Sequence, residues 1–94
     1  MKTTEGKIKD QVKAFLKERG AWFTVGSGLA TLPIDIIGCY KGRFFAIEIK
    51  APGKKPTPRQ LLAMEFIEYV AGGVAFWGDN YEEIKRAFIL EFEE

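Results

Sequence analysis

The sequence predicts an α/β domain in which about four strands are flanked by helices, in the order α-β-β-β-α-β-α. Apolar residues recur at helical spacing in some segments, and short apolar runs bounded by glycine or proline lie between them. One stretch, residues 33–50 with the sequence PIDIIGCYKGRFFAIEIK, is divided by Lys41 and Gly42. Two apolar runs around a tight turn are typical of a β-hairpin, and we expect this hairpin to be the centre of the domain.

The composition limits the chemistry that the chain can perform. With 94 residues we expect one domain, and a net charge of +1 means that nucleic-acid binding would need local clusters of basic residues. Histidine is absent, which leaves carboxylates, lysine or a metal-bound water as reactive groups. No apolar run reaches the roughly 18 residues that span a bilayer, and the polar start MKTTEGKIKD is not a secretory signal. We therefore expect a soluble, cytoplasmic protein with no membrane partner.

A first helix is predicted from a cap at Thr3 or Thr4 to Gly20. Glu5 lies near its inward stripe, so it is a candidate third carboxylate for the site described below. The alternative, a first-turn glutamate that interacts with the helix dipole, is equally consistent with the sequence. The inward stripe consists of Ile8, Val12, Phe15 and Leu16, and the charged face of Lys7, Lys9 and Lys13.

A short strand is predicted from Ala21 to Val25, followed by the segment Gly26-Ser27-Gly28. This segment is either a plain flexible linker or a loop that closes over a substrate. Ser27 is a candidate nucleic-acid contact.

The predicted hairpin brings two acids together. A turn centred on Lys41 and Gly42 pairs Tyr40 with Arg43 and, counting outward, Asp35 with Glu48. Facing Cβ atoms lie about 5 Å apart, where two carboxylates repel by roughly 3 kcal/mol at an effective dielectric of about 20. A divalent cation such as Mg²⁺ would remove that repulsion.

Lys50 lies two residues beyond Glu48, so strand alternation points it to the same face of the hairpin. The alternative is that Asp35 and Glu48 are ordinary exposed charges, and a slip of one residue in the turn would separate them. Both faces of the hairpin are otherwise apolar, which predicts helices on each side of it. With the acids lie Ile37, Cys39, Phe44 and Ala46, and on the opposite face lie Ile34, Ile36, Tyr40, Phe45, Ile47 and Ile49. Cys39 is expected to be a small core residue in a reducing compartment.

The loop after Lys50 leads to a second helix, capped by Thr57 with Pro58 at its first position. Basic residues crowd this helix start, where the dipole and free amides also favour anions, so they are candidate phosphate contacts or else a solvated basic loop. Gln60 falls in the first turn, where its amide can reach the hairpin end or meet solvent. The basic residues are Lys54, Lys55 and Arg59.

The second helix is predicted to run to Gly72-Gly73 and to pack on the sheet through a broad apolar surface. A strand at 74–77 and a third helix opening at 79–82 follow. The last residues, 89–94, are compatible with a frayed helix end, an edge strand or a dimer contact. Trp22 and Trp77 are expected in the core or an interface rather than as base-stacking platforms.

These residues resemble the PD-(D/E)XK nuclease superfamily, and in detail its VRR-NUC branch. The resemblance rests on Glu5, on Pro33-Ile34-Asp35, on Glu48-Ile49-Lys50 in the next strand and on Gln60 opening the second helix. It covers nearly the whole chain, so it implies a single VRR-NUC-like nuclease domain over residues 1–94 with a restriction-endonuclease-like mixed sheet. One departure is Met64, which stands where relatives with a Gln-Xaa-Xaa-Xaa-Tyr motif have tyrosine.

The resemblance implies an endonuclease that hydrolyses DNA phosphodiesters with Mg²⁺ or Mn²⁺. Asp35 and Glu48 would be metal ligands, Lys50 the catalytic lysine, Glu5 a further acid at the metal site and Gln60 a supporting polar residue. The carbonyl of Ile49 lies within reach of the same metal.

Stand-alone members of this branch, of bacterial or phage origin, pair as homodimers that cut branched DNA such as four-way (Holliday) junctions. The resemblance therefore implies a homodimer acting on branched DNA in the cytoplasm of a bacterium or of a phage's host. The alternative is a catalytically silent DNA-binding or assembly module of the same fold. A sequence-reading, restriction-type nuclease would need further elements to enter a groove, and this chain has little length for them.

Overall fold

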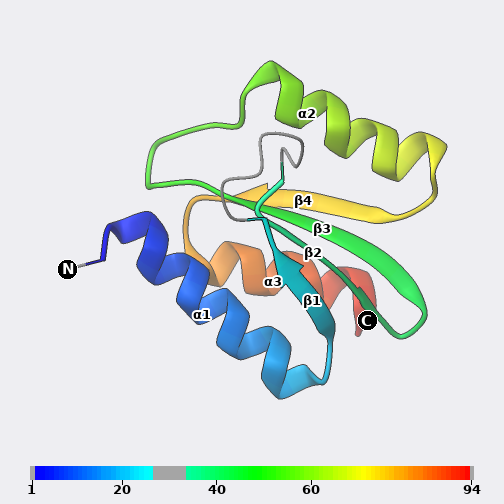
Figure 1. The fold of residues 1–94 in the computed structure, drawn as a ribbon, viewed down its shortest axis with the longest axis horizontal. Coiled ribbons are helices and arrows are strands. Elements are labelled where there is room, and N and C mark those ends of the chain that lie inside the picture. The colour runs from blue at the N-terminus through cyan, green and yellow to red at the C-terminus, as the bar shows by residue number, and fades with distance from the viewer. Residues whose placement is uncertain (1, 27–33, 94) are drawn as a thin grey trace.

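The structure, a computed structural model, describes residues 2–26 and 34–93. The described residues form a sheet in the order β1-β2-β3-β4, in which β1, β2 and β3 pair antiparallel and β4 pairs parallel to β3. The predicted element order and the mixed four-stranded sheet are confirmed (Figure 1). The elements are α1 (Thr4–Arg19), β1 (Trp22–Val25), β2 (Ile36–Tyr40), β3 (Arg43–Ile49), α2 (Pro58–Glu65), its π-helical continuation η1 (Phe66–Val70), β4 (Val74–Gly78) and α3 (Tyr81–Phe92).

The sheet is sandwiched between helices, as the two apolar faces of the hairpin predict. Helices α1 and α3 cover one face and α2 the other (Figure 1). The larger core lies under α1 and α3, where Phe88 packs edge-on against Phe15 and Phe45. The smaller core lies under α2 and contains Ile34, Ala46, Met64 and Ala75.

The helix boundaries follow from their caps. Thr3 caps α1, because its hydroxyl accepts a hydrogen bond from the Gly6 N–H at 3.0 Å, and Gly20 ends the helix with a positive φ of 81°. Asn80 caps α3 in the same way. Helix α3 continues to Phe92, whose side chain is buried in the larger core, so the chain end is helical up to that residue.

The hairpin register is the one that the sequence predicts. Lys41 and Gly42 both have positive φ, at 51° and 77°, as a two-residue type I′ turn requires. Tyr40 pairs with Arg43, and the pairing continues to Ile36 opposite Ile47. Asp35 lies just outside the paired region, which explains one error in the predicted faces: Ile34 belongs to the core under α2 and not to the core under α1 and α3.

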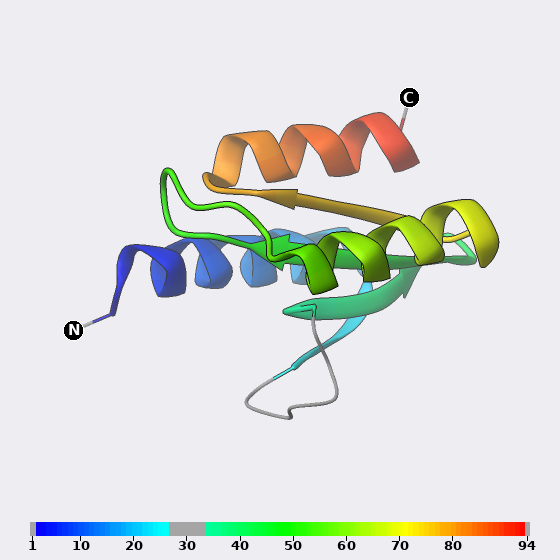
Figure 2. The same ribbon diagram turned by 90° about the horizontal axis from the view of Figure 1, so that it is seen from above.

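One further prediction about burial is wrong, because Cys39 is exposed and not a core residue. Trp22, its partner across β1 and β2, is 68% exposed, so of its two predicted places, core or interface, the core does not apply. The physical reason is the position of α2, which lies over β3 and leaves β1 uncovered (Figure 2). Apolar residues near the β1 edge of the sheet therefore face solvent on the face that α2 covers elsewhere.

Helix α2 packs on the sheet through one side only. Met64 is its buried residue, while four apolar side chains of α2 and η1 point outward and are 60–81% exposed. The broad apolar surface predicted for this helix is thus divided into an inner stripe and an outer apolar face. The outer apolar face consists of Leu62, Phe66, Tyr69 and Val70.

No helix within the described ranges is both long and apolar enough to cross a membrane.

Candidate active site

Asp35 and Glu48 meet at the open end of the hairpin, where each carboxylate accepts a hydrogen bond from the backbone of the opposite segment. The Asp35 N–H donates to Glu48 Oε1 at 3.0 Å, and the Ile49 N–H donates to Asp35 Oδ2 at 3.0 Å. Each carboxylate is therefore oriented by the strand that carries the other. The register of the turn thus fixes the relative position of the two acids.

Glu48 lies in an environment that is unusual for a carboxylate. Glu48 as a whole residue is 2% exposed, and it is the one charged residue that is buried among the residues the structure describes. Burial raises its pKa above the ordinary value, and the negative charge of Asp35 raises it further. The ammonium of Lys50, 3.1 Å from Glu48 Oε2, and the Asp35 N–H oppose this rise without cancelling it.

Gln60 links the start of α2 to Glu48. Its side-chain carbonyl accepts from the Thr57 N–H at 2.9 Å, and Thr57 Oγ1 accepts from the Gln60 N–H at 3.2 Å, so the two residues form a capping box. With its carbonyl held in this way, the side-chain NH₂ points to Glu48 Oε2 and donates to it at 2.9 Å. The helix cap therefore positions the amide that supports the buried acid, and the Thr57-Pro58 helix start is confirmed.

Lys9 also reaches the site, although the sequence pattern assigns it to the outer, charged face of α1. Its ammonium lies 3.3 Å from Asp35 Oδ1, and both side chains are largely buried. A signal for this contact exists in the sequence. Lys9 directly follows Ile8 and precedes Val12 by three residues, so it borders the buried stripe of the helix.

Trp77 is a second residue whose place beside the site sequence reasoning missed. It pairs with Glu48 across the parallel strands β3 and β4 and is 36% exposed, so of the predicted core and interface positions the core does not apply. Paired residues in a sheet project to the same face, and the indole therefore flanks the buried acid.

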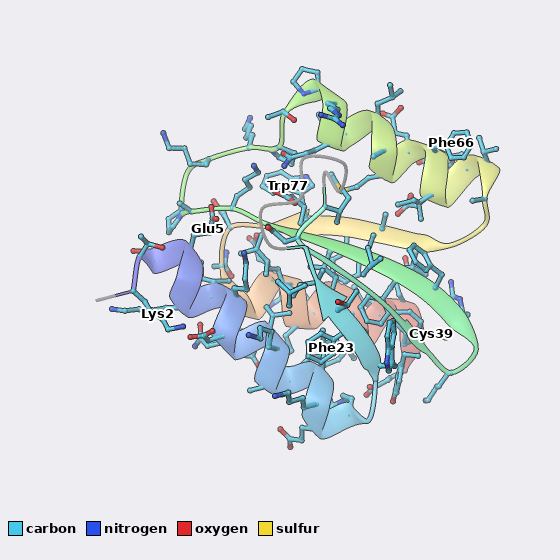
Figure 3. All side chains as sticks on the ribbon, in the orientation of Figure 1. Lys2, Glu5, Phe23, Cys39, Phe66 and Trp77 are labelled. Carbon is cyan, nitrogen blue, oxygen red and sulfur yellow. The ribbon has the colours of Figure 1, made fainter. Side chains whose placement is uncertain are left out.

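A cavity of about 620 Å³ lies between the start of α1 and the loop after β3. Glu5 lines it from α1 and Pro52 from the loop, and Figure 3 shows Glu5 at the N-terminal end of the helix beside that loop. Within the described ranges, no three acids, cysteines or histidines come close enough to share an ion. The structure thus brings together Asp35, Glu48, Lys50 and Gln60 but does not add Glu5 to the pair of acids.

The predicted phosphate contacts Lys54, Lys55 and Arg59 are all exposed, and they lie on the loop before α2 and in its first turn. The loop is tied to the end of β4 because the Gly53 N–H donates to Asp79 Oδ2 at 2.9 Å. Ser27 lies outside the described residues.

The donor set of this site suits a hard divalent cation. Two carboxylates lie side by side, and no thiol or imidazole accompanies them among the described residues. Mg²⁺ and Mn²⁺ prefer such oxygen ligands. The residues present therefore fit a metal of this class.

The fold itself has a known counterpart. No family model matches the chain, and no curated protein sequence matches it. A solved structure named "VRR_NUC domain" is similar over 99% of this chain and 100% of its own length, with a TM-score of 0.72 and 21% sequence identity. The chain therefore has the fold of a VRR_NUC domain.

Proposed function

We propose that this chain is a nuclease of the VRR-NUC branch of the PD-(D/E)XK superfamily, one domain over residues 1–94, that hydrolyses DNA phosphodiesters with Mg²⁺ or Mn²⁺. The observation that carries the proposal is Glu48: a buried carboxylate with a raised pKa, held against Asp35 and contacted by Lys50 and Gln60. Functional sites are where such perturbed and costly arrangements concentrate. The fold shared with a VRR_NUC domain supports the same conclusion.

In this proposal Asp35, Glu48 and the backbone carbonyl of Ile49 hold the metal, with Glu5 a further acid at the wall of the cavity. When bound, the ion lowers the pKa of a water molecule and neutralises charge on the phosphate. Lys50 orients the attacking water or stabilises the negative charge of the transition state from its place beside Glu48. Gln60 keeps Glu48 in position through the capping box.

The substrate strand would contact the basic start of α2. Lys54, Lys55 and Arg59 offer positive charge at a helix start, where the helix dipole also favours phosphate oxygens. Ser27 stays a candidate contact. The proposed compartment is the cytoplasm of a bacterium or of a phage's host.

We further propose a homodimer that acts on branched DNA such as four-way junctions, and the outer apolar face of α2 and η1 supports the dimer. Phe66 lies four residues after Leu62 and four before Val70, so a two-fold axis at Phe66 places Leu62 of one copy against Val70 of the other. With exposed fractions of 60–81%, two such faces would bury about 1,000 Å², the lower limit for a specific interface.

The experiment that tests the enzyme is cleavage of supercoiled, linear duplex and four-way-junction DNA with Mg²⁺ or Mn²⁺. Wild type should cut, and Asp35→Ala should lose at least about 100-fold in rate, the scale on which one stabilising group acts in a preorganised site. Asp10→Ala is the matched control, because Asp10 is an acid on α1 that pairs with Lys2 and not with the site. Equal activity of wild type and Asp35→Ala would refute the proposal.

The second candidate is a catalytically silent DNA-binding or assembly module. The exposed basic residues at the start of α2 would serve it equally well. Tight junction binding without cleavage under any divalent metal would select this alternative.

A further inference from the structure

Two ammonium groups face the two acids of the site. Lys50 lies 3.1 Å from Glu48 Oε2, and Lys9 lies 3.3 Å from Asp35 Oδ1. Two positive charges therefore compensate two negative ones without any metal. These contacts reduce the repulsion between Asp35 and Glu48 from inside the chain itself.

The two lysines differ in how firmly they are placed. Lys50 directly follows β3, on the same strand end as Glu48, and its side chain is 16% exposed. Lys9 comes from a separate element, α1, and its side chain is 25% exposed. A lysine has a flexible four-carbon stem that can carry its charge into solvent. Lys9 can therefore leave Asp35 without disturbing the hairpin.

Lys9 occupies the carboxylate oxygen that a metal would need. Asp35 Oδ2 accepts a hydrogen bond from the Ile49 N–H, and Oδ1 faces Lys9, so a cation bound through Oδ1 would meet the Lys9 ammonium. A divalent ion at Oδ1 would also repel an ammonium held at this distance. Metal binding at Oδ1 and the Lys9 contact would therefore oppose each other.

We propose that Lys9 is a built-in counter-ion, which neutralises Asp35 in the metal-free protein and which a divalent cation must displace on binding. This inference rests on the metal site of the proposed function. It predicts that Lys9 stabilises the metal-free protein and weakens its affinity for the ion.

The test compares wild type with Lys9→Met, Lys9→Arg and Lys7→Met by calorimetric titration with Mg²⁺ and with Mn²⁺, and by thermal unfolding without metal. Lys9→Met keeps the length of the side chain and removes its charge, so it should bind either ion about tenfold more tightly, a change of about 1.4 kcal/mol. It should also melt at a lower temperature without metal. Lys9→Arg keeps the charge and should bind like wild type. Lys7→Met, which removes an exposed charge from the same helix, controls for the net charge.

If Lys9→Met binds Mg²⁺ or Mn²⁺ with the affinity of wild type or more weakly, the inference about Lys9 is overturned while the metal site stands. Absence of binding in every variant would instead overturn the metal dependence of the proposed function, and the inference with it. Metal binding by Lys9→Met and by no other variant would support both the inference about Lys9 and the metal site of the proposed function. Circular dichroism of each variant shows whether it is folded before the titration.

Discussion

Replacing Gln60 by alanine tests the coupling between the helix cap and the buried acid. The change removes the hydrogen bond to Glu48 Oε2 and the half of the capping box that Gln60 provides to the Thr57 N–H. Losing a capping contact costs about 1 kcal/mol, and losing a hydrogen bond to a buried charged group costs about 1.5–3 kcal/mol. We therefore expect the free energy of unfolding to fall by about 2.5–4 kcal/mol, a large part of the stability of a domain of this size.

The assay is urea unfolding of the metal-free protein followed by circular dichroism. Thr57→Ala is the matched control, because it removes the other half of the capping box and leaves the bond between Gln60 and Glu48 in place. It should cost about 1 kcal/mol. If Gln60→Ala is no more destabilising than Thr57→Ala, the Gln60 amide does not support Glu48 and the reasoning fails.

Three other predictions follow from the same structure. Carbon-13 NMR of the metal-free protein should give Glu48 a pKa above 4.5, and a measured value at or below 4.5 would contradict this. Because the pKa is raised in the folded state, the contribution of Glu48 to stability is complete below pH 4.5 and is lost as the pH rises through the folded pKa. Gly38→Ala should lower the free energy of unfolding, measured in urea, by about 2 kcal/mol or more, because a Cβ there would lie 2.2 Å from the Trp22 carbonyl oxygen. Cys39→Ala, at an exposed position on the same strand, should change the free energy of unfolding little. By light scattering, wild type should be a dimer and Phe66→Asp a monomer. The control Leu90→Asp, at a similarly exposed apolar position on α3, should stay dimeric, and a monomeric wild type would exclude the proposed dimer face.

The sequence predicted the hairpin well because its signals are local. Lys41 and Gly42 define a turn of fixed geometry, and the register of a two-residue turn determines every pair outward from it. The meeting of Asp35 with Glu48 follows by counting. Gln60 was placed in the first turn of α2 by the Thr57-Pro58 signal, so its approach to the hairpin end was one of two open alternatives.

The remaining features depend on how elements pack, which periodicity does not record. Apolar character predicted a core position for Cys39 and a core or interface position for Trp22, but the sequence does not say which strands α2 covers. The contact of Lys9 with Asp35 depends on the reach of a long side chain from α1, and the pattern of that helix records only where its Cα lies. The outward position of Phe66 was not predictable for a similar reason, because the apolar character of a helix face does not indicate which element it packs against.

The exposed thiol of Cys39 gives the chain a natural attachment point for a spectroscopic probe. Cys39 is the single cysteine of the sequence, so a maleimide dye would label one position without any engineering. It lies four residues along the strand from Asp35, which corresponds to about 13 Å at 3.3 Å per residue. A fluorophore there would be close enough to report on a DNA molecule arriving at the carboxylates, and far enough away to leave them untouched.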